Sequence, residues 1–208
     1  MKRCAFLSVL TICLALPSLV AAQGSSDWNH AEVGVFADYF RLSRTTPDIN
    51  FVGLGGRAAF NVHPNVQLEA EMAYDFKRNF TSTFSNGVTT QLVNTRLRPL
   101  TALFGPKFQA GTSGPFRAFV TGKLGFVNFS TSDQNAVSGF KGALGGVTDG
   151  NTQFAVYPGA GVEGFWGPFG LRLDVGDVIY FDGGAQNNLR VTFGPQIRLL
   201  ILPAGASL

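Results

Sequence analysis

Charged residues are scarce in this chain. They make up 14% of its 208 residues, and 26 glycines and 20 phenylalanines fill much of the difference from the roughly 25% that a typical soluble domain carries. A surface with so little charge is difficult to keep in water. The composition therefore disfavours an ordinary soluble domain.

Cysteine is nearly absent. Both cysteines, Cys4 and Cys13, lie in a segment with a basic start (MKR), an apolar run over 5–16 and the small residues VAA at 20–22, which is the pattern of a secretory signal peptide. The apolar run is shorter than the roughly 20 residues of a spanning helix. We expect a cleaved signal peptide at 1–22, and a mature chain with neither a disulfide nor a thiol metal site.

Runs of lysine and arginine are also missing. Removing Lys2 and Arg3 from the 16 basic residues leaves a mature chain with a net charge of about +1. Proteins that bind phosphate backbones usually carry a clustered basic patch. We therefore expect no nucleic-acid partner.

The two histidines do not form a recognisable catalytic or metal-binding motif either. His30 precedes the first expected strand and His63 lies in a turn before Pro64, and neither has a nucleophile or carboxylate at a recognisable spacing. We expect both to be solvated, and we predict no enzyme activity, no metal site and no cofactor. The sequence GAGVEG at 159–164 matches the dinucleotide fingerprint by accident, because another strand follows it where that site needs a helix.

What the chain does have is a two-residue periodicity. Eight segments alternate apolar and polar side chains, and each is long enough to cross a bilayer as a tilted strand. They cover about 31–42, 51–62, 66–75, 95–108, 116–129, 153–165, 169–180 and 188–201. Because proline removes a ladder donor, we expect bulges at Pro106, Pro158 and Pro195, and the register near Pro99 stays open.

The alternation alone does not say which face meets water. In the stretch NVQLEAEMAY, one face carries Gln67, Glu69 and Glu71, and the other carries Val66, Leu68, Ala70, Met72 and Tyr74. In a soluble sheet the apolar row enters a core. In a membrane barrel it meets lipid, and the acids point into the lumen.

The connections between these segments alternate in length. They are short at 63–65, 110–115 and 166–168, and mostly longer at 43–50, 76–94, 130–152 and 181–187. Short periplasmic turns and longer external loops are typical of outer-membrane barrels. Aromatic residues near the strand ends are expected to form two interfacial girdles: Tyr39, Phe40, Tyr74, Phe76, Phe116, Phe129, Phe165, Trp166, Phe169, Tyr180 and Phe181.

Three stretches resemble the bacterial outer-membrane β-barrel family, in particular the small eight-stranded barrels similar to outer-membrane protein A. They are GLGGRAAFNVHPNVQLEAEMAY (53–74), FGPKF (104–108) and FGPQIRL (193–199). The resemblance implies an all-β, eight-stranded antiparallel up-and-down transmembrane β-barrel at 31–202, after a short segment at 23–30 and before a tail at 203–208.

The resemblance also implies a location and partners. The location is the outer membrane of a Gram-negative-type bacterium, and the partners are outer-membrane lipid, including lipopolysaccharide, and the barrel-assembly machinery. Such barrels usually end in an aromatic residue that this machinery reads, whereas this chain continues past Arg198 as LLILPAGASL.

Followed through all strands, the alternation directs seven basic and seven acidic side chains into the lumen. An eight-stranded barrel is just wide enough for side chains to fill, and an unpaired charge inside it costs several kcal/mol, so we expect a filled lumen of paired charges. The basic residues are Arg57, Lys107, Arg117, Lys123, Arg172, Arg190 and Arg198, and the acidic ones are Glu32, Asp38, Glu69, Glu71, Asp75, Glu163 and Asp174.

The same alternation directs Arg41, Arg96 and Arg98 outward near the external strand ends. There they either bind lipopolysaccharide phosphates, which suit guanidinium groups, or form an ordinary polar rim, since charge costs little near the interface.

These features favour a closed barrel with a structural or surface-interaction role through external loops, whose ligand the sequence does not identify. A narrow pore for small solutes is the alternative. A secreted soluble ligand-binding barrel of the lipocalin type, with the apolar row lining its cavity, is a third possibility.

Overall fold

The computed structural model describes residues 30–43, 48–85, 90–110, 115–133 and 151–200, and the expected signal peptide and C-terminal tail lie outside these ranges. Within them, no helix is long and apolar enough to cross a membrane. The strands are β1 (His30–Leu42), β2 (Ile49–His63), β3 (Val66–Asp75), β4 (Arg78–Ser85), β5 (Thr90–Ala110), β6 (Phe116–Asp133), β7 (Asn151–Trp166), β8 (Phe169–Asp177), β9 (Ile179–Phe181), β10 (Ala185–Gln186) and β11 (Leu189–Leu200).

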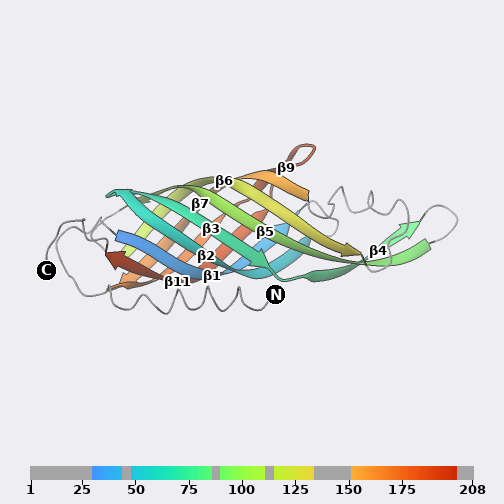
Figure 1. Ribbon diagram of the computed structural model, residues 1–208, viewed down its shortest axis with the longest axis horizontal. Helices are drawn as coiled ribbons and strands as arrows, with labels where there is room; N and C mark the ends of the chain where they lie inside the picture. The colour runs from blue at the N-terminus through green and yellow to red at the C-terminus, as the bar shows by residue number, and fades with distance from the viewer. Residues whose placement is uncertain (1–29, 44–47, 86–89, 111–114, 134–150, 201–208) are drawn as a thin grey trace, which may run out of the picture.

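The strands form a closed antiparallel barrel (Figure 1). Its wall runs β1, β2, β3, β5, β6, β7, β8 and β11 in chain order, and β11 pairs with both β8 and β1 to close the sheet. β8 and β9 both pair with β7 in the same register, and Val178 separates them. The expected all-β, eight-stranded up-and-down barrel is confirmed.

The two ends of the barrel differ. The turns at 63–65 and 166–168 lie at the same end as the start of β1 and the end of β11, and we call this the turn end. The opposite end, from which β4 and β5 extend beyond the wall, we call the loop end (Figure 1). At the turn end Gly167 has a φ of 62°, a left-handed conformation that glycine adopts without steric cost.

Two strands lie where loops were expected. β4 pairs with the first part of β5, from Arg78 opposite Leu97 to Ser85 opposite Thr90, inside the segment 76–94. β10 pairs with β9 inside the segment 181–187. The first hairpin is rich in threonine, phenylalanine and valine, residues that favour strands, so the length of this segment alone did not make it a loop.

The bulges expected at the prolines do not form. The register is the same on both sides of Pro106, Pro158 and Pro195, although each of these prolines lacks a pair on one of its two neighbouring strands. It is also unchanged at Pro99, which lies opposite Phe129. A proline removes one N–H, but the pairs on either side hold the alignment. Among the described strand pairs, the register shifts between Asn61 and His63, beside a turn.

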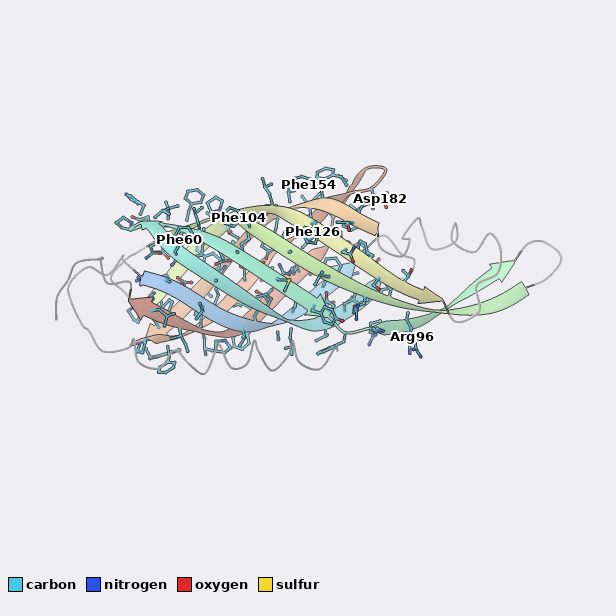
Figure 2. The ribbon with its side chains drawn as sticks, viewed as in Figure 1. Phe60, Arg96, Phe104, Phe126, Phe154 and Asp182 are labelled. Carbon is cyan, nitrogen blue, oxygen red and sulfur yellow. The ribbon has the colours of Figure 1, made fainter. Side chains whose placement is uncertain are left out.

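The outer surface of the wall is apolar. Figure 2 shows Phe60, Phe104, Phe126 and Phe154 on the outside of the barrel, and all four are exposed. Among the described residues of the eight wall strands, outward charges occur only near the loop end, at Arg41, Arg96, Arg98 and Asp177. This arrangement is the reverse of a soluble barrel with an apolar cavity, and it suits a wall that faces lipid.

Candidate functional site

The charged interior is the most distinctive site of the molecule. All fourteen charged residues that alternation directed inward have buried or partly buried side chains, with only Arg198 outside the buried class. Strands on every side of the barrel contribute to this set, which we call the lumen network. Its members are Glu32, Asp38, Arg57, Glu69, Glu71, Asp75, Lys107, Arg117, Lys123, Glu163, Arg172, Asp174, Arg190 and Arg198.

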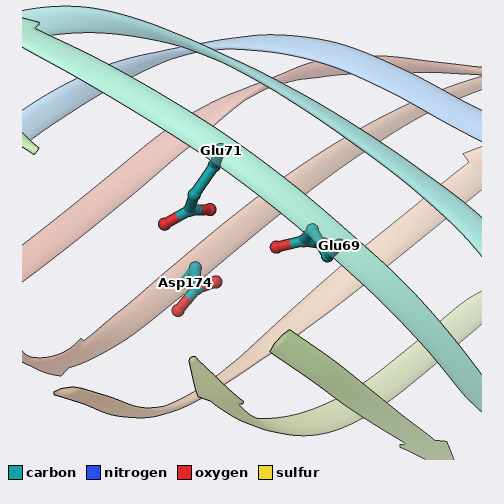
Figure 3. Close-up of side chains that lie close together, drawn as sticks. All are labelled: Glu69, Glu71 and Asp174. Carbon is teal, nitrogen blue, oxygen red and sulfur yellow. The ribbon is translucent and has the colours of Figure 1, made fainter. Parts of the chain in front are cut away.

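Lys123 lies at the centre of the lumen network. Its Nζ contacts Glu69 Oε1, lies 2.7 Å from Glu71 Oε2 and lies 4.0 Å from Asp174 Oδ2. Figure 3 shows these three carboxylates turned toward one another in the interior. One oxygen from each lies within 4.8 Å of the others, as in a metal site, but the Lys123 ammonium already supplies positive charge there.

Two arginines extend this cluster around the barrel. Arg172 contacts Glu69 and donates from Nη2 to Asp174 Oδ2 at 2.7 Å. Arg190 donates from Nε to both oxygens of Asp38, at 3.0 and 3.1 Å, and from Nη1 to Glu71 at 2.6 Å. Acids and bases therefore alternate, so each buried charge in this cluster has an opposite partner.

A second cluster lies nearer the turn end. Lys107 Nζ lies 2.9 Å from Glu163 Oε2 and 3.5 Å from Glu32 Oε2. Glu32 Oε1 also accepts from Arg198 Nε at 3.1 Å and lies 2.9 Å from His30 Nε2. His30 is thus a buried first residue of β1, and the expectation that it is solvated was wrong because its inward parity was not considered.

Three members of the lumen network have other surroundings. Arg57 donates to Thr192 Oγ1 at 2.8 Å. Asp75 is fully buried, and neither of its oxygens accepts a hydrogen bond from a described residue. Arg117 lies 5.7 Å from the ring centre of Phe165. Alternation placed these residues inside the barrel, but alternation does not determine which side chains meet.

Four aromatic rings pack between the wall and the cations. Arg57 lies 4.4 Å from the ring centre of Phe36, Arg172 lies 4.1 Å from that of Phe119, Lys123 lies 5.4 Å from that of Tyr157, and Arg198 lies 3.1 Å from that of Phe165. These are cation–π contacts, which strengthen when desolvated. The Tyr157 hydroxyl also donates to Asp174 at 2.7 Å.

Inward glycines make the room for these rings. A Cβ at Gly159 would lie 2.7 Å from Tyr157, and a Cβ at Gly161 would overlap the Phe119 ring and the Leu173 carbonyl oxygen. The GAGVEG sequence lies in β7, where its glycines give space to large neighbours.

Gly161→Ala should destabilise the barrel by about 1–3 kcal/mol, because the added methyl forces Phe119 or the backbone to move. Chemical unfolding in detergent micelles measures this change. Gly122→Ala is the matched control, since a Cβ there meets nothing within 4 Å. Equal stability of the two variants would contradict this expectation and show that Phe119 and its neighbours rearrange at little cost in free energy.

An apolar cluster closes the interior toward the loop end. It includes Phe40, Phe51, Phe129 and Tyr180, all at most 1% exposed, and the rings of Phe129 and Tyr180 meet edge to face at 5.3 Å. We call this cluster the apolar layer. Sequence reasoning missed it by assigning Phe40, Phe129 and Tyr180 to the lipid-facing girdles.

The inward–outward alternation along the strands, applied to these aromatic residues, predicts the apolar layer. Phe40 follows Asp38 on the inward side of β1, and Phe129 follows Lys123 on that of β6. Phe165 was misassigned in the same way and lies inside the barrel. The other expected girdle aromatics are exposed or, for Tyr39, partly exposed: Tyr74, Phe76, Phe116, Trp166, Phe169 and Phe181.

The three outward arginines of the loop end do not form a single group. Arg41 Nη2 lies 2.5 Å from Asp48 Oδ2, so its charge is balanced locally. Arg98 contacts the Tyr74 hydroxyl, and its guanidinium lies 4.4 Å from the ring centre of that tyrosine. Arg96 is exposed at the base of the β4–β5 hairpin (Figure 2).

Comparison with known proteins identifies the fold. No protein-family model matches the chain, and no curated protein matches it. Among solved structures, the attachment invasion locus protein Ail of Yersinia pestis has a TM-score of 0.51 at 12% identity, covering 82% of this chain and 97% of Ail. Neisserial surface protein A (NspA) has a TM-score of 0.51 at 12% identity, covering 86% of this chain and 100% of NspA. The chain therefore has the fold of the small eight-stranded outer-membrane β-barrels.

Proposed function

We propose that this protein is an outer-membrane barrel with a closed lumen, and that its role is structural or lies in surface interactions made by the loop end. The filled interior carries the proposal. The lumen network occupies the middle of the barrel and the apolar layer lies across it toward the loop end. A path for solutes would have to separate several buried ion pairs, each costly to break.

The surface of the barrel supports the membrane location. An apolar outer wall whose described outward charges lie near the loop end suits a bilayer, and export through the expected signal peptide and insertion by the barrel-assembly machinery would deliver the chain there. The names of Ail and NspA refer to attachment and to the cell surface. A role at the exposed end of the barrel is in keeping with both.

Cell fractionation and solute entry test this proposal together. The protein should sediment with outer membranes and migrate differently on SDS gels before and after boiling. Phospholipid vesicles that contain it should swell in a small sugar no faster than vesicles without protein. Recovery as a soluble periplasmic protein would contradict the location, and rapid swelling would favour the narrow pore.

We also propose that Arg96 and Arg98 contact the phosphates of lipopolysaccharide. Both lie on the outward side of β5 at the loop end, where Arg96 is exposed and Arg98 is partly exposed. Guanidinium groups bind phosphates by paired hydrogen bonds. Arg41 is a weaker candidate because Asp48 already binds it.

Lipopolysaccharide binding by purified protein in detergent micelles tests this contact. The variant with both Arg96→Gln and Arg98→Gln should bind about tenfold or more weakly, since each charged hydrogen bond is worth about 1.5–3 kcal/mol. Arg41→Gln is the control and should change binding little. Unchanged binding by the double variant would assign these arginines to an ordinary polar rim.

A further inference from the structure

Within the part of the chain that the structure describes, the β4–β5 hairpin has one unpaired sheet edge. β4 pairs with β5 along its whole length, and among the described residues it pairs with no other strand. Its other edge therefore presents backbone N–H and C=O groups beyond the end of the barrel wall (Figure 1). Such an edge is a template for one more strand.

The β4 edge lacks the features that usually prevent pairing. Natural edges are protected by lysine, proline, inward charges or bulges. The only charge on β4 is Arg78, its first residue; residues 79–85 read NFTSTFS, without charge or proline, and the β4–β5 register runs through them without a shift. Threonine and phenylalanine also favour strands. This edge is open to an added strand in both chemistry and geometry.

The sequence of β4 indicates which strand fits. FTSTF reads the same in both directions about Ser82. In an antiparallel pair of two copies centred there, Ser82 lies opposite itself, Phe80 lies opposite Phe84, and Thr81 lies opposite Thr83. Aromatic pairs and threonine pairs are favourable across strands, and a two-fold pairing of identical strands is self-complementary.

We propose that two copies of this protein associate by antiparallel pairing of their β4 edges about Ser82. This inference rests on the proposed surface role of the loop end. Figure 1 shows the hairpin continuing the long axis of the molecule, so antiparallel strands place the two barrels at opposite ends of the pair. The copies therefore lie in facing membranes, because barrels side by side in one membrane would present their β4 strands in parallel.

Charge placed at Ser82 tests the contact in detergent micelles. Sedimentation velocity should show a concentration-dependent dimer of the unmodified protein. Ser82→Lys and Ser82→Glu each set like charges opposite each other, so each alone should be monomeric at concentrations where the unmodified protein is dimeric. An equimolar mixture of the two variants should form dimers again.

Val93→Lys is the matched control. Val93 is the partner of Ser82 on β5, so this variant adds the same charge to the same hairpin but away from the β4 edge, and it should stay dimeric. Loss of the dimer in Val93→Lys but not in Ser82→Lys would assign the contact to β5 and overturn the proposal. A mixture of folded Ser82→Lys and Ser82→Glu that stays monomeric would also overturn it.

Vesicles test the facing arrangement. Phosphatidylcholine vesicles that carry the unmodified protein should cluster, as turbidity reports, and those with Ser82→Lys should not. A dimer in micelles without vesicle clustering would contradict facing membranes. A monomeric, non-conducting protein would overturn this inference alone, whereas a conducting barrel that dimerises would overturn the closed lumen and leave the β4 contact standing.

Discussion

Lys123→Met should destabilise the barrel by about 3–5 kcal/mol, which is the cost of removing one partner from a buried ion pair. Lys123 contacts Glu69 and lies 2.7 Å from Glu71, and all three side chains are almost fully buried. Without the ammonium, neighbouring carboxylates face one another in a medium that screens charge poorly. Urea unfolding in detergent micelles measures the loss.

Two further variants establish the cause of that loss. Adding Glu69→Gln to Lys123→Met should recover part of the stability, because it removes one uncompensated charge, and the double-mutant cycle gives the coupling. Lys77→Met makes the same chemical change at an exposed residue and should stay within about 0.5 kcal/mol of the unmodified protein. A loss below about 1 kcal/mol for Lys123→Met would show that water or side-chain rearrangement stabilises the carboxylates around Lys123 without its ammonium group.

Leu124→Arg should cost about 2–4 kcal/mol, the value for arginine on the lipid face near the midplane of a bilayer. Leu124 is 58% exposed on the outside of β6, between Phe104 of β5 and Val156 of β7. Unfolding of the protein from lipid vesicles measures this cost. The same substitution at Thr152, which is exposed on β7 near the loop end, should cost no more than about 1 kcal/mol.

The two arginine variants together test where the membrane lies on the barrel. If Leu124→Arg were as stable as Thr152→Arg, the outer wall at Leu124 would lie outside the hydrocarbon. In a soluble protein the two variants would also have similar stabilities.

Alternation and the lengths of the connections together were enough to assign the faces of the wall. Glu69 and Glu71 lie inside and Leu68 and Met72 outside, because a two-residue period leaves only two arrangements and the loop lengths choose between them. The same rule placed Lys123 and Arg190 in the lumen from strands far apart in the chain. Which acid each base meets depends on strand tilt and stagger, which alternation does not report.

Other features depended on neighbours that the sequence does not reveal. The apolar layer was missed because Phe40 and Phe129 lie near strand ends, where position suggested a lipid girdle and parity was not applied. The β4 strand was missed because the length of the segment 76–94 was taken to indicate a loop, although the next strand along the chain, β5, is its partner. Pro195 stays in register because its pairing with Leu171 is held by the pairs beside it.

Planar-bilayer recording of the purified protein tests the closed lumen most directly. We expect no stable openings from the unmodified barrel, because the Lys123 and Arg190 ion pairs and the apolar layer fill its interior. Neutralising both Glu69 and Glu71 to glutamine should loosen the lumen network and permit only small, flickering openings. A large, stable conductance from the unmodified protein would contradict the closed lumen and identify the barrel as a channel.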